Sequence, residues 1–137
     1  MAVKLPNASR SAMANALVDL IDGGAAAGYV EIRSGAGPAD PDSAADGDLL
    51  VTIPLNDAAF GAAADGVATI DSDPALSAAA TGDGIAGWAR FYDSDDASVL
   101  DLDVGEGSGS LSLDNTDIAV DQVVTITGGT ITMPDGQ

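Results

Sequence analysis

Carboxylates are the only side chains in this sequence that are numerous enough for acid–base or metal chemistry. The 137 residues include 22 Asp and Glu, of which 20 are Asp, but no Cys and no His. Without these two residue types, thiol nucleophiles, zinc or iron–sulfur sites and a Ser-His-Asp triad are excluded. Paired carboxylates can cleave glycosides, but 1 Trp, 2 Tyr and 2 Phe are too few to line a sugar cleft. We therefore predict that the protein is not an enzyme.

Two short Asp clusters have a spacing that could bring carboxylate oxygens around a calcium ion. They contain Asp93, Asp95 and Asp96 in one segment and Asp71 and Asp73 in another. Neither cluster has the Gly and Glu positions of an EF-hand loop. An ordinary polar turn also explains such a spacing, because Asp side chains bind their own backbone in turns. The candidate metal ligands are therefore Asp93, Asp95 and Asp96, for a structural Ca²⁺, and no other cofactor is predicted.

The charge balance limits the partners of this protein. Only 4 Lys and Arg stand against the 22 acids, which gives a formal net charge of −18. A surface this acidic does not bind the phosphate backbone of nucleic acids by releasing counterions. The sequence has no apolar run of about 18 residues, so we predict no transmembrane helix and no membrane partner.

The N-terminal part of the chain has the 3.6-residue period of an amphipathic helix, which we place at residues 8–22. Asn7 is the expected N-cap, and Gly23 and Gly24 end the helix. The apolar stripe either covers one side of a sheet or docks on a partner subunit. Its residues are Ala12, Met13, Ala16, Leu17, Leu20 and Ile21, and the interface candidates among them are Met13, Leu17 and Leu20.

From residue 29 to residue 133 the period of the apolar residues changes to two, which is typical of strands. Gly128 and Gly129 either make a tight hairpin or form a bulge in one long strand. We predict a single domain over residues 1–137 that is mainly β, an antiparallel β-sandwich or small barrel with one N-terminal α-helix. The strands are expected at 29–34, 49–55, 66–70, 76–80, 85–92, 98–104, 111–113, 120–127 and 130–133. The predicted core consists of Leu17, Leu20, Ile21, Val30, Ile32, Val51, Ile53, Trp88, Phe91, Leu100, Leu102, Val124 and Ile126, with Trp88 as its largest anchor.

Several segments, in their order along the chain, resemble a group of small structural proteins of tailed-phage virions. They are the start Met1–Ala8, the Ala-rich helix through 18–22, the strand 29–35 with the Pro- and Asp-rich loop after it, and the blocks 59–62, 66–69, 88–90, 124–127 and 133–134. This resemblance covers most of the chain, but it contains no catalytic signature. It implies a virion component that is assembled in the host cytoplasm.

Within that resemblance, two positions in the particle compete. A capsid decoration (cement) protein would stabilise the head shell through contacts with the major capsid protein and with other copies of itself. A tail component (tube, terminator or fibre-associated β-domain) is the alternative. From a different class, a free carbohydrate- or receptor-binding β-sandwich module would need exposed aromatic platforms, for which Trp88, Tyr29 and Tyr92 are available.

Overall fold

The computed structural model describes residues 3–134, which form one helix and nine strands. The helix begins one residue earlier than predicted and ends at Ile21. Most strands fall close to the expected segments, but the two-residue strand Asp117–Ile118 was not predicted. In chain order the elements are α1 (Asn7–Ile21), β1 (Tyr29–Ser34), β2 (Leu49–Pro54), β3 (Val67–Thr69), β4 (Leu76–Ala79), β5 (Gly84–Tyr92), β6 (Ser98–Glu106), β7 (Leu111–Leu113), β8 (Asp117–Ile118) and β9 (Val123–Thr132).

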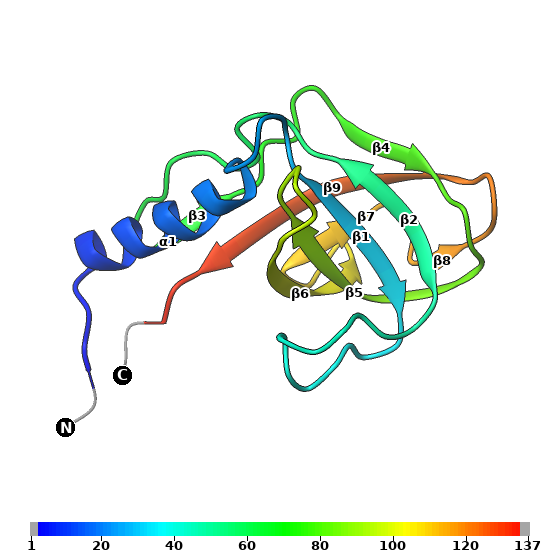
Figure 1. The fold of residues 1–137 in the computed structure, drawn as a ribbon, viewed down its shortest axis with the longest axis horizontal. Coiled ribbons are helices and arrows are strands. Elements are labelled where there is room, and N and C mark those ends of the chain that lie inside the picture. Colours follow the sequence, from blue (N-terminus) through cyan, green and yellow to red (C-terminus); the bar gives the residue numbers. More distant parts are fainter. Residues whose placement is uncertain (1–2, 135–137) are drawn as a thin grey trace.

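All nine strands belong to one sheet, with the order β2-β1-β5-β6-β7-β9-β3. The short strands β4 and β8 pair with β9 and β5, respectively. Every pair is antiparallel except β6–β7, which is parallel. The sheet curls into a half-barrel, consistent with the predicted sandwich or small barrel (Figure 1). On the open side, the N–H groups of Thr81 and Gly82 donate to the carbonyl oxygen of Leu50, which ties the chain after β4 to β2.

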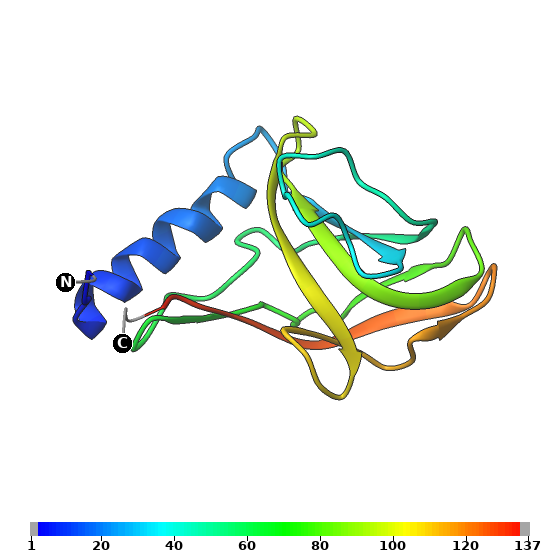
Figure 2. The ribbon, with the colours of Figure 1, turned by 90° about the horizontal axis from the view of Figure 1, so that it is seen from below.

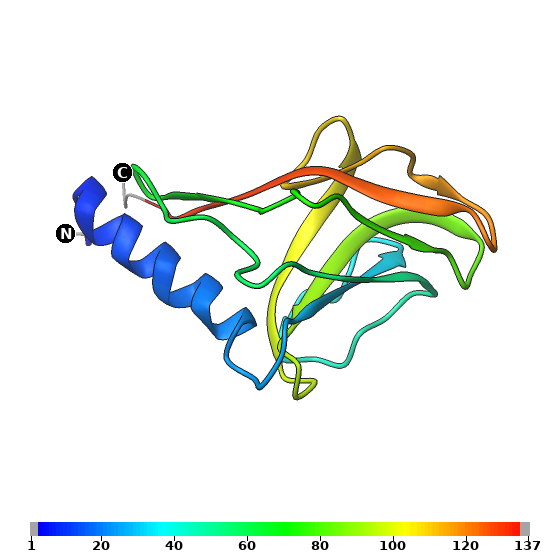
Figure 3. The ribbon, with the colours of Figure 1, turned by 90° about the horizontal axis from the view of Figure 1, so that it is seen from above.

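Helix α1 extends from one side of the half-barrel, across the angle between β6 and the end of β9 (Figures 2 and 3). Its first turn is tied to the end of β9, because the Arg10 guanidinium donates to the Met133 carbonyl at 3.0 and 2.7 Å. Beyond its last turn, the Ala26 N–H donates to Ser94 in the β5–β6 turn. The buried side chains of α1 are Ala14, Val18 and Ile21. The helix therefore covers part of the core that the sheet leaves open.

The core is filled by the alternate side chains that the period of two predicts. Val30 and Ile32 of β1 are fully buried, as are Val51 and Ile53 of β2 and Phe91 of β5. Ile21, Val124 and Ile126 are buried too, and Leu17, Leu100 and Leu102 pack partly buried against the core.

Of the predicted core residues, Leu20 is exposed and Trp88 is buried apart from the main cluster. Leu20 is 57% exposed, because the buried stripe of α1 runs through Ala14, Val18 and Ile21. Trp88 is buried but stands outside the main core cluster. It lies on the side of β5 that loop 35–48 covers, where its Nε1 donates to the Ser34 carbonyl. The predicted burial of Trp88 is confirmed, but the segment that covers it was not predicted, since periodicity alone does not say which face of a strand is covered by a loop.

The structure differs from the sequence-based expectation at the N-cap of α1, and it decides between the two alternatives for Gly128 and Gly129. Asn7 is the first helical residue, and Pro6 is the N-cap without a side-chain cap. The segments 120–127 and 130–133 were expected as two strands, but residues 123–132 form one strand, β9, which passes through Gly128 and Gly129, and residues 120–122 lie before it. The pairing between β7 and β9 shifts register between Ser112 and Leu113, so the bulge alternative holds.

Candidate functional site

The three carboxylates proposed as metal ligands lie in the turn between β5 and β6. The Asp93 carboxylate accepts the backbone N–H groups of Asp95 and Ala97, each at 2.9 Å. Asp96 Oδ1 accepts the Tyr29 hydroxyl at 2.7 Å. The same turn chemistry is found at the other cluster, where Asp71 accepts the Asp73 N–H. Asp93 and Asp71 thus act as turn acceptors, as expected for Asp, whereas Asp96 binds a side chain of β1.

Tyr29 and Tyr92 form a stacked pair beside this turn. Their ring centroids are 5.0 Å apart and the planes are inclined by 14°. Burial, followed by the hydrogen bond to Asp96, raises the pKa of Tyr29, and burial and the neighbouring Glu31 raise that of Tyr92. Both phenols therefore stay protonated at neutral pH and act as hydrogen-bond donors.

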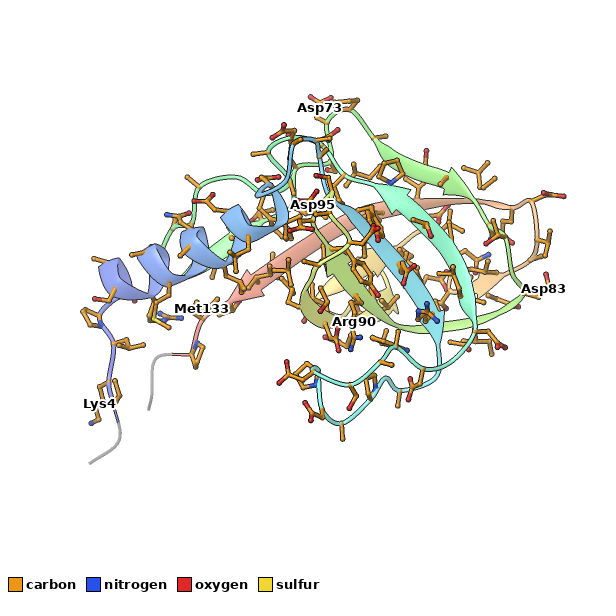
Figure 4. All side chains as sticks on the ribbon, viewed as in Figure 1. Lys4, Asp73, Asp83, Arg90, Asp95 and Met133 are labelled. Atoms are coloured by element: carbon orange, nitrogen blue, oxygen red, sulfur yellow. The ribbon has the colours of Figure 1, made fainter. Side chains whose placement is uncertain are left out.

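Arg90 joins three parts of the molecule on the same face. Its Nε and Nη2 donate to the two carboxylate oxygens of Asp101 on β6 at 2.6 and 2.9 Å. Its Nη1 and Nη2 donate to the carbonyls of Ser43 and Pro41 in loop 35–48, and its Cζ lies 5.3 Å from the centre of the Trp88 ring. Figure 4 shows Arg90 between the sheet and this loop. The guanidinium is 4% exposed, so it is a structural anchor rather than a surface for a ligand.

The three interface candidates on α1 have different environments. Met13 is 44% exposed and Leu20 is 57% exposed, whereas Leu17 is partly buried against the core. Met13 and Leu20 are seven residues apart, two turns along the helix, and therefore lie on similar sides of α1. These two side chains form an exposed apolar row on a helix that projects from the half-barrel.

Sequence reasoning missed the polar stripe of α1, which binds the backbone of the segment before β3. Ser11 accepts the Gly66 N–H, Asn15 accepts the Ala63 N–H and Asp22 accepts the Ala59 N–H. A signal was present, because Ser and Asn lower helix propensity and their four-residue spacing places them on one side. The stripe positions α1 and leaves the Met13–Leu20 row outside.

The described residues contain no cluster of three or more acids that could hold a metal ion, and no pocket is found on them. In the same part of the chain, no helix is long and apolar enough to cross a membrane. Comparison of the chain with protein-family models, with curated proteins and with solved structures finds no match.

Asp22 is an acid whose charge opposes folding. Burial, with Asp57 and Asp19 nearby, raises its pKa above 3.8 despite the hydrogen bond from Ala59. The Asp22 carboxyl therefore binds its proton more tightly in the folded state than in the unfolded chain. Stability is lost as the pH rises through the range in which this carboxyl ionises. We expect Asp22→Asn to increase the free energy of unfolding at pH 7, because an amide oxygen still accepts the Ala59 N–H. The gain should shrink toward pH 4 in urea titrations.

Asp103 serves as the matched control for this prediction. Hydrogen bonds from Ser110 lower its pKa, so the ionised form stabilises the fold and the contribution is lost as the pH falls. Asp103→Asn should therefore decrease stability at pH 7, with a difference that vanishes in acid. If both variants change the free energy of unfolding at pH 7 in the same direction, the opposite pKa shifts of Asp22 and Asp103 are contradicted.

Proposed function

We propose that the chain is a non-enzymatic structural protein of a tailed-phage virion, a decoration protein of the head shell. The proposal rests on the resemblance of its segments to such virion proteins and on one structural observation. That observation is the exposed Met13–Leu20 row on a helix that projects beyond the half-barrel. Apolar side chains in such a position gain free energy when a neighbouring subunit covers them.

The proposed mechanism is the burial of surface across subunit boundaries. Each contact of a decoration protein can be modest, because many copies act on one shell and their contributions combine. The partners in this proposal are the major capsid protein and other copies of the chain. The strongly acidic remainder of the surface keeps the particle hydrated and disfavours contact between particles.

The carbohydrate-binding alternative has less support from the aromatic residues. Such a module needs exposed rings, but Trp88 is 2% exposed and lies under loop 35–48. Tyr29 and Tyr92 stack on each other, which occupies one face of each ring.

Quantitative mass spectrometry of purified virions tests the proposal. We expect hundreds of copies per particle, close to the number of major capsid protein subunits. A few to tens of copies would instead indicate a tail or head–tail junction component. Absence of the chain from washed particles would overturn the virion proposal altogether.

A further inference from the structure

Uncompensated positive charge is confined to one part of the described structure, the start of α1. Arg33 and Arg90 are paired with Glu31 and Asp101. Arg10 donates to a backbone carbonyl and to the neutral Asn7, and Lys4 makes no ion pair with any described residue. The side chain of Asn7 accepts a hydrogen bond from Arg10 and donates one to the carboxylate of Asp65, which does not contact Arg10 directly through an ion pair. The start of α1 therefore suits an acidic partner.

Exposed large apolar side chains gather in two places. Val3, Met13 and Leu20 lie on α1 or just before it, with exposed fractions between 44% and 74%. The other three described ones are Ile85 at the start of β5, Val120 after β8 and Val123 at the start of β9, with exposed fractions between 49% and 68%. Figures 1 and 3 show that β8 and the start of β9 lie at the end of the molecule opposite to the start of α1.

The second place is acidic, whereas the first is basic at the start of α1 and has Asp19 beside Leu20. β8 pairs with the start of β5, which aligns Asp117 with Ile85. Asp83 accepts the Val120 N–H and Asp121 follows directly in the chain. All three acids are exposed. Figure 4 places Lys4 and Asp83 at opposite ends of the molecule.

We propose that these two places bind each other in neighbouring copies of the chain. The α1 surface of one copy would contact the β8 surface of the next copy. The α1 surface consists of Lys4, Arg10, Met13 and Leu20. The β8 surface consists of Asp83, Ile85, Asp117, Val120 and Asp121. Contact between two β8 surfaces would oppose acids on both partners. The head-to-tail arrangement pairs Lys4 and Arg10 with these acids while it covers apolar side chains on both partners.

A head-to-tail contact leaves one surface of each kind free on a dimer, so association continues into rings or open chains. The net charge of −18 opposes this association at long range. At about 0.15 M salt the Debye length is about 8 Å, so repulsion between whole copies is screened while contacts within the interface persist. Association should therefore strengthen as NaCl rises from about 0.01 M to about 0.15 M.

Sedimentation velocity of the full chain tests this inference, which rests on the proposed function and deepens it by naming the surfaces through which copies of the chain meet. One variant, Met13→Ser with Leu20→Ser, blocks the α1 surface, and another, Ile85→Ser with Val120→Ser, blocks the β8 surface. The wild type should form species larger than dimers as concentration rises, and each blocked variant should be monomeric. An equimolar mixture of the two variants should form dimers only, because it contains one intact surface of each kind.

Matched controls separate this contact from non-specific association. Ala36→Ser with Ala44→Ser alters exposed residues of loop 35–48 and should leave the oligomers unchanged, while circular dichroism checks that every variant is folded. A wild type that stays monomeric at every concentration and salt, or a β8-blocked variant that still dimerises alone, would overturn the inference. Neither result bears on the presence of the chain in virions, which the copy number tests separately.

Discussion

Arg90→Met should lower the free energy of unfolding by about 3 kcal/mol, the largest effect that we expect from a polar substitution. The guanidinium makes two hydrogen bonds to Asp101 and two to carbonyls of loop 35–48, and it is 4% exposed. Its removal leaves a carboxylate and two carbonyls without their donors. Asp101 keeps 21% of its side chain exposed and can recover some hydration, so the expected cost lies at the lower end for a broken buried pair.

Urea unfolding measures this loss, and the single Trp reports where it acts. Trp88 is 2% exposed beneath the loop that Arg90 holds. Its fluorescence emission should shift to longer wavelength in Arg90→Met under native conditions, and loop 35–48 should become sensitive to proteases.

Arg33→Met is the matched control, because Arg33 stands on the neighbouring strand and is also paired with an acid. The Arg33 side chain is more exposed than that of Arg90, at 18% against 5%, and its Nε is buried without a hydrogen-bond partner. Its one hydrogen bond to loop 35–48 is the 3.3 Å contact of Nη1 with the Gly47 carbonyl. We therefore expect a loss of at most about 1 kcal/mol. Similar losses for the two variants would show that Arg90 does not anchor the loop.

Gly87→Ala should lower the free energy of unfolding by about 2–3 kcal/mol, because an added methyl group has no room. Gly87 lies opposite the irregularity in β1, where the register with β5 shifts between Arg33 and Ser34. A Cβ on Gly87 would overlap the carbonyl oxygen of Gly35, which is backbone and cannot turn away. Relief requires the start of loop 35–48 to move away from β5.

Gly128→Ala separates this clash from the general effect of replacing a strand glycine. Gly128 of β9 pairs with Ser112 of β7, and a Cβ on Gly128 would meet no heavy atom within 4 Å. We expect stability to be unchanged or increased by up to about 1 kcal/mol, since Ala loses less backbone entropy on folding. If both Ala variants lose the same stability in thermal or urea unfolding, steric overlap at Gly87 is not the cause.

The head-to-tail contact depends on side chains whose positions the sequence did not reveal. Met13 and Leu20 were interface candidates from the helical period, and both are exposed. Ile85, Val120 and Val123 were not singled out, because in the sequence they read as ordinary strand residues. Ile85 lies in the short pairing of β8 with β5, and two-residue strands carry too few side chains for a periodic signal.

The sequence alone determined the local elements of this protein. The period of 3.6 located α1 within one residue, and the period of two located β1, β2, β5 and β6, because each pattern reflects which side chains share a face. Turn-forming Asp residues were also predictable, since their carboxylates bind nearby backbone N–H groups.

Only the tertiary structure decided what covers each face. Loop 35–48 folds over Trp88 and Arg90, and the polar stripe of α1 binds the segment before β3, so that Leu20 faces outward. The parallel pairing of β6 with β7 and the placement of β1 between β2 and β5 join residues far apart in the chain. Periodicity indicates which side chains share a buried face, but the segment that covers this face is determined by contacts between distant parts of the chain.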